Sequence, residues 1–125
     1  MESLEIIQKL FEKAEELGWS RDHDCDDTYT FSKSSPAGQD FSFTVDTEGE
    51  PTFFLSNIKE YYNDYDPSYE AYLWLDDSGH GKNGAPYEMT DVYNDMVTCG
   101  DMMYDLWNVL YTYYYKEFYV EEDNV

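Results

Sequence analysis

The spacing of apolar residues predicts a helix at the start of the chain and a longer one near its end. In residues 3–17 the apolar side chains recur three and four positions apart, as on one face of an α-helix. Ser3 is suited to cap this helix, and Gly18 is suited to the left-handed residue that ends one. From residue 88 the same spacing predicts the longest helix, with Gly100 as a candidate bend. Its predicted apolar face consists of Val92, Met96, Cys99, Met103, Leu106, Leu110 and Tyr114.

Between these helices the pattern changes to alternation, which is typical of β-strands. Apolar and small polar residues alternate over residues 28–32 and again over 41–45, and turn-forming residues separate the two runs. This order predicts an antiparallel hairpin. Residues 52–55 fit either a third strand or the beginning of the next helix. The acidic segment 22–27 is predicted to be a polar loop.

Two short helices are expected before the last one. Residues 56–65 carry apolar and tyrosine side chains at helical spacing, and Asp66-Pro67 is a typical helix start. The glycines of residues 76–86 indicate a loop. We therefore predict one α+β domain over residues 1–125, with residues 121–125 frayed. It comprises an N-terminal helix, a small antiparallel sheet of two or three strands, two short helices, and a long C-terminal helix packed across the sheet.

Charge narrows the choice of partner. The 125 residues include 28 Asp and Glu but 7 Lys and Arg, for a net charge of −21, while a hydrophobic share of 42% is still sufficient for a core. Such a charge attracts basic proteins and disfavours direct binding to nucleic acid or to an anionic membrane. Two cysteines, no basic leader and no long apolar run favour a cytoplasmic protein with reduced thiols.

Two acidic clusters and the tyrosines are the predicted partner-binding residues. Five carboxylates of the last helix project into an arc of about 140°, mostly opposite its apolar face. They are Glu88, Asp91, Asp95, Asp101 and Asp105. The second cluster is the acidic loop, with Asp22, Asp24, Asp26 and Asp27. Among 14 tyrosines, Tyr111 and Tyr115 are the candidates for contact with cationic side chains. The simpler interpretation is a solvated acidic surface with tyrosines at the edge of the core.

No catalytic residue, metal site or cofactor is predicted. A run of aspartates resembling an EF-hand begins at Asp22, but Asp27 and Lys33 replace the glycine and glutamate that this loop requires. The glycines around His80 lack the order of a phosphate-binding loop. The remaining candidate ligands match no zinc spacing and no nucleophile motif: His23, Cys25, His80 and Cys99.

Three stretches together resemble a family of small acidic proteins encoded by phages and conjugative elements of bacteria. They are residues 34–43 (SSPAGQDFSF), residues 65–74, which begin Tyr-Asp-Pro, and residues 84–86 (GAP). The tyrosine-rich last helix departs from the pattern of that family. The resemblance implies no catalytic residues and a context of antirestriction and anti-CRISPR inhibitors that mimic DNA.

We therefore expect a non-enzymatic inhibitor that mimics nucleic acid. Its partner would be a basic protein with a DNA- or RNA-binding groove, such as a host-defence nuclease. Two alternatives stay open: an accessory module that docks through a tyrosine-rich patch, and a cation-binding module. The pattern leaves the oligomeric state open.

Overall fold

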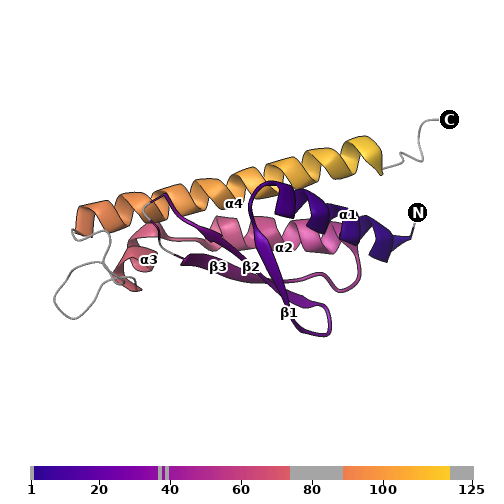
Figure 1. Cartoon of the computed structure of the whole chain (residues 1–125), viewed down its shortest axis with the longest axis horizontal. Helices are drawn as coiled ribbons and strands as arrows, with labels where there is room; N and C mark the ends of the chain where they lie inside the picture. The colour runs from indigo at the N-terminus through magenta and orange to yellow at the C-terminus, as the bar shows by residue number, and fades with distance from the viewer. Residues whose placement is uncertain (1, 37, 39, 74–88, 119–125) are drawn as a thin grey trace.

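The chain folds into an antiparallel sheet and a set of helices, in the order shown in Figure 1. The computed structural model describes residues 2–36, 38, 40–73 and 89–118. The elements are α1 (Ser3–Glu16), β1 (Ser20–Cys25), β2 (Thr28–Ser34), β3 (Asp40–Asp46), α2 (Pro51–Asp64), α3 (Pro67–Leu73) and α4 (Met89–Glu117). This arrangement confirms the predicted α+β class. The predictions for Glu88, His80, the loop 76–86 and residues 121–125 lie outside the described residues.

The sheet has three antiparallel strands in the order β1-β2-β3. The predicted hairpin is β2 and β3, but the third strand is β1, in the segment predicted to be an acidic loop. Residues 52–55 belong to α2 instead. The prediction failed at β1 because its inward positions are not apolar: the Arg21 guanidinium lies 4.4 Å from the centre of the Phe11 ring, and His23 stacks on Tyr29. Both polar side chains lie against aromatic rings of other elements, so this strand shows no alternation of apolar residues.

Two helix starts differ from the prediction. The helix α2 begins at Pro51, because proline in the first turn lacks only a donor that would be unpaired there. Ser3 lies inside α1 and does not cap it; its hydroxyl donates to the Glu50 carboxylate at 3.3 Å. The expected end of α1 is confirmed, since Gly18 has φ +97°. The start of α3 is confirmed too, since Asp66 Oδ1 accepts the Ser68 N–H at 2.9 Å.

The helices form layers on one side of the sheet. Helix α1 packs against β1, α2 packs against β3, and α4 packs along α1, α2 and α3 (Figure 1). The expected packing of the last helix directly across the sheet is therefore wrong, because α1 and α2 lie between. Among the described residues no helix is long and apolar enough to cross a membrane.

The core joins the sheet to these helices through aromatic rings. Phe54 of α2 contacts Phe11 of α1 and Phe31 of β2, with ring centres 5.4 and 5.9 Å apart. The predicted apolar face of α4 is buried except for Tyr114, which is only partly buried. The helix continues through Gly100, where the Tyr65 ring would lie 3.1 Å from an added Cβ atom. Glycine at this position permits close contact between α4 and the end of α2.

Candidate functional site

Outside the β1 bulge, where the exposed Cys25 lies opposite Thr28, the outer face of the described sheet carries hydroxyls and carboxylates. Strand register places Asp22, Thr30 and Thr44 side by side, and Thr44 is exposed, so these positions face away from the helices. The remaining outward positions follow by alternation. They are Ser20 and Asp24 of β1, Thr28, Ser32 and Ser34 of β2, and Asp40, Ser42 and Asp46 of β3. No lysine or arginine interrupts this face in the part of the chain that the structure describes.

A short hydrogen-bond chain orients one of these carboxylates. The Thr30 hydroxyl donates to Asp24 Oδ2 at 2.6 Å, and the Thr44 hydroxyl lies 2.9 Å from the Thr30 hydroxyl. Because a hydroxyl has one proton to donate, the Thr44 hydroxyl donates to that of Thr30. The chain thus runs from β3 across β2 to β1 and holds the Asp24 carboxylate on the open face.

The turn between β1 and β2 extends the acidic surface beyond the sheet. Asp26 adopts a positive φ of 47°, and His23 Nε2 lies 2.6 Å from the Asp26 carbonyl oxygen. Asp27 follows it in the turn, and both side chains are exposed. The structure therefore brings Asp22, Asp24, Asp26 and Asp27 together on one strand and its turn. Asp40 and Asp46, on the same sheet face, were missed because isolated acids give no cluster in the sequence.

The predicted acidic stripe of the last helix is smaller than expected. Asp91, Asp101 and Asp105 are exposed on α4. Asp95 is only 6% exposed, and its carboxylate accepts a hydrogen bond from the buried Ser35 hydroxyl. Asp95 is therefore not part of an exposed stripe, because the end of β2 covers its side of the helix. Asp101 lies beside the end of α2, where it lines a shallow hollow with Tyr62 and Asn63.

Aromatic rings hold most of the cations in the described residues. Lys13 lies 4.8 Å from the centre of the Tyr113 ring, and Lys33 lies 5.9 Å from that of Trp19 while donating to the Leu17 carbonyl. Lys59 lies 4.2 Å from the centre of a Trp107 ring. Two ion pairs form between described residues, Lys13–Glu16 and Arg21–Glu15. Most described carboxylates consequently have no cation beside them.

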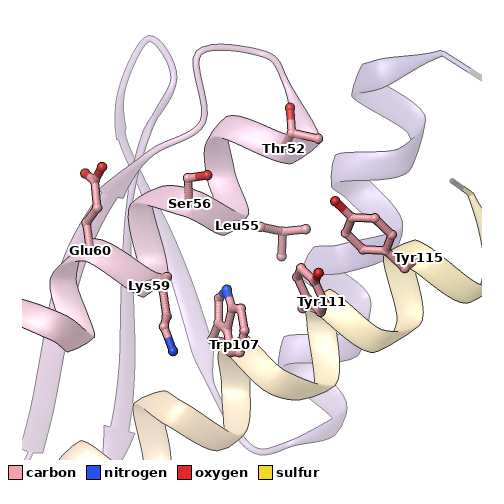
Figure 2. Close-up of a pocket in the computed structure, with 8 residues that line it drawn as sticks. All are labelled: Thr52, Leu55, Ser56, Lys59, Glu60, Trp107, Tyr111 and Tyr115. Carbon is pink, nitrogen blue, oxygen red and sulfur yellow. The ribbon is translucent and has the colours of Figure 1, made fainter.

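A groove between α2 and α4 is the main aromatic surface (Figure 2). It encloses about 280 Å³. Trp107, Tyr111 and Tyr115 line it from α4, and Leu55 and Lys59 are among the α2 residues on the opposite side (Figure 2). The remaining lining residues are Thr52, Ser56 and Glu60.

The rings along α4 form a column in which each ring contacts the next. The centre of the Tyr111 ring lies 4.8 Å from that of Trp107 and 4.5 Å from that of Tyr115. Tyr104 continues the column, and it shares Lys59 with Tyr62 and Trp107. Tyr111 and Tyr115 remain 39% and 41% exposed, as the sequence interpretation required. Trp107 and Tyr104 were missed, although the spacing 107-111-115 places three rings on one side of a helix.

A second hollow at the junction of α2 and α3 combines acids with tyrosines. It encloses about 460 Å³. Its lining comprises Tyr61, Asp64, Tyr65, Asp66, Tyr69 and Glu70. Burial, and then the neighbouring Asp66, raise the pKa of the Glu70 carboxyl. The Tyr65 hydroxyl donates to the Met96 carbonyl at 2.7 Å, and burial raises its pKa most strongly. None of these acids was among the predicted site residues.

The candidate nucleophile Cys99 lies in the apolar face of α4. Burial, followed by Asp95 and Glu70, raises the pKa of its thiol to about 12, so the thiol stays protonated near neutral pH. Cys25 is exposed at the end of β1. The described residues contain no group of three or more His, Cys, Asp or Glu side chains that could hold a metal ion.

Comparison with protein-family models, with curated proteins and with solved structures finds no match. The function is therefore inferred from the chemistry of these surfaces.

Proposed function

We propose that this protein is a non-enzymatic binding protein that occupies the basic nucleic-acid-binding groove of another protein. One observation carries the proposal: among the described residues, most cations lie against aromatic rings and only Lys13 and Arg21 form ion pairs with carboxylates. The carboxylates stay available to a partner's lysines and arginines. More specifically, we propose a cytoplasmic inhibitor that is encoded by a phage or conjugative element and blocks a host-defence nuclease.

The sheet surface is the face best suited to this role. Asp22, Asp24, Asp26 and Asp27 are exposed on β1 and its turn, and the neighbouring outward side chains of β2 and β3 are small. Small hydroxyl side chains let a partner's long cationic side chains approach these carboxylates closely. Duplex DNA carries one charge per about 1.7 Å of its axis, so a groove built for DNA presents many cations to such a face.

The direct test is affinity capture from a bacterial lysate on the immobilised full chain, followed by elution with duplex DNA. We expect basic nucleic-acid-binding proteins to be captured at low salt, released by duplex DNA, and lost at high salt, because screening weakens the attraction. Capture of no protein, or of proteins that DNA does not displace, would contradict the proposal.

Two matched sets of substitutions locate the face. Asp22→Asn, Asp24→Asn and Asp27→Asn remove three charges from the sheet side, whereas Asp91→Asn, Asp101→Asn and Asp105→Asn remove three from α4. We expect the first set to lower the affinity for a captured partner more than the second. The reverse order would move the binding face to α4 while leaving electrostatic binding intact.

The exposed aromatic column favours a second candidate, an accessory module that docks through the α2–α4 groove. Tyr104, Tyr111 and Tyr115 each keep about two fifths of their surface exposed, and tyrosine is enriched at protein interfaces. Binding of this kind would persist at high salt and weaken with Tyr111→Ala. Tyr93→Ala is the matched control, since Tyr93 has a similar exposure of 37% on the same helix but does not line the groove.

A further inference from the structure

Strand β1 forms one edge of the sheet, and its outer side is open. It pairs with β2 on one side. Among the described residues, no backbone group bonds to its other side. The opposite edge differs, because the Asp46 N–H of β3 donates to Asn57 Oδ1 at 2.8 Å. An open edge presents unpaired backbone N–H and C=O groups, which are the groups that an added strand binds.

The side chains of β1 determine which strand would fit. Asp22 and Asp24 lie on the outer face, and directly opposed residues of adjacent strands have Cβ atoms about 5 Å apart. Lysine or arginine opposite these aspartates would form cross-strand ion pairs. On the inner face the Arg21 guanidinium is already placed against Phe11 and Glu15, so its charge is locally balanced.

A second copy of this chain does not fit the same edge. When two copies of β1 pair antiparallel within one continuous sheet, outer-face residues oppose outer-face residues. In the registers that place Asp22 of one copy opposite Asp22 or Asp24 of the other, like charges meet, which is destabilising. The register shift between His23 and Cys25 also bends the edge. These features hinder self-association but leave the edge open to a strand of opposite charge.

We infer that the β1 edge binds an extended basic segment of a partner protein, which adds to the sheet as a fourth strand with lysine or arginine at alternate positions. The inference rests on the proposed function, because it takes the partner to be basic. Backbone hydrogen bonds to β1 supply part of the affinity for this partner, and its alternate cations determine the register of the added strand.

The test uses the full chain and a fluorescent eight-residue peptide of alternating lysine and threonine, with binding followed by anisotropy at low salt. A peptide of the same composition with the lysines in one block is the control for charge alone. Two further peptides carry N-methyl groups on the odd or on the even backbone nitrogens. Since only alternate N–H groups of an added strand face its neighbour, one methylated peptide should lose binding and the other should keep it.

Two pairs of substitutions complete the test. The double substitution Asp22→Asn and Asp24→Asn removes two negative charges from the open edge strand. The control, Asp40→Asn and Asp46→Asn, removes two negative charges from the same sheet face at β3. We expect the β1 substitutions to raise the Kd of the alternating peptide roughly threefold to tenfold, as judged from cross-strand pair energies. The β3 substitutions should raise it less.

Equal binding of both methylated peptides, together with equal effects of the two pairs, would overturn the β1 mode and leave the proposed function standing. Failure of the alternating peptide to bind would also overturn the inference. The proposed function is decided separately by the capture experiment, which does not depend on a strand.

Discussion

The outer sheet face and the aromatic side of α4 differ in whether their charged groups have a partner within the molecule. On the sheet, small hydroxyl residues surround carboxylates that have no cation beside them. On α4, the ring column of Tyr104, Trp107, Tyr111 and Tyr115 borders Lys59, whose ammonium group lies over three rings. The sheet face leaves its carboxylates available to a partner, whereas the rings beside α4 bind the Lys59 ammonium group within the molecule.

This difference shows how a chain with a net charge of −21 can fold and still present an unneutralised surface. If its few cations paired with carboxylates, they would reduce the negative field where they lay. Rings instead hold Lys59 beside α4, on the helix side of the sheet, since a neutral ring attracts a cation through its quadrupole. The abundance of aromatic residues and the acidity therefore support each other.

The largest expected effect is at Phe54, which connects the two regions. Phe54→Ala would leave a cavity against Phe11 and Phe31, and we expect a loss of about 3–5 kcal/mol in the free energy of unfolding. The neighbouring Phe53, 36% exposed, is the control, and Phe53→Ala should cost no more than about 0.5 kcal/mol. Urea denaturation measures both, and similar losses would show that the core does not join sheet and helices at Phe54.

The next effect is at the contact between α4 and α2. Gly100→Ala gains helix propensity but sets a methyl group against the Tyr65 ring, which its hydrogen bond to Met96 holds in place. We expect a net destabilisation of about 1–3 kcal/mol, typical of overpacking. In a Tyr65→Ala background the same change should instead stabilise by up to about 1 kcal/mol. Thermal unfolding of the four proteins in this cycle tests the reversal of sign, and its absence would contradict the role given to Tyr65.

A smaller effect is expected at Lys59. Lys59→Met keeps most of the side-chain volume but removes the cation over the rings, and we expect a loss of about 1 kcal/mol in unfolding free energy. Lys9→Met is the control, because Lys9 is an exposed cation on α1. Equal effects of the two substitutions in urea denaturation would mean that the rings do not hold the Lys59 charge.

The smallest effect concerns Glu70 and depends on pH. Its raised pKa means that the folded protein binds this proton more tightly than the unfolded chain does. The resulting stability is present below the unfolded pKa and is lost as the pH rises through the folded pKa. Glu70→Gln should therefore stabilise the protein by a few tenths of a kcal/mol near neutral pH, as expected for relief of a like-charge pair with Asp66.

That advantage should disappear in acid, where the Glu70 carboxyl is protonated. Glu12→Gln on α1 serves as the control for the loss of one negative charge. Thermal unfolding at neutral and acidic pH checks the prediction, and a benefit of Glu70→Gln that grows in acid would contradict it.

Local patterns predicted the elements whose buried residues are apolar. The hairpin of β2 and β3 and the buried face of α4 followed from spacing, because Phe31, Phe43 and Leu106 each face a common core. Strand β1 was missed because its inward residues, Arg21 and His23, are polar and contact rings of other elements. The candidate site residues also divide into local and long-range cases. Asp22 and Tyr111 are exposed, as expected. Asp95 is buried because Ser35, 60 residues away in sequence, lies against it.

The sequence by itself determined the acidity, the α+β class and the apolar face of the last helix, because composition and periodicity are local properties of the chain. The tertiary structure alone decided which carboxylates share a face, which rings hold the cations, and which strand edge is open. These depend on contacts between segments far apart in the chain, such as Lys59 with Trp107 and Ser35 with Asp95. No pattern within one segment specifies the neighbour that folding places beside it.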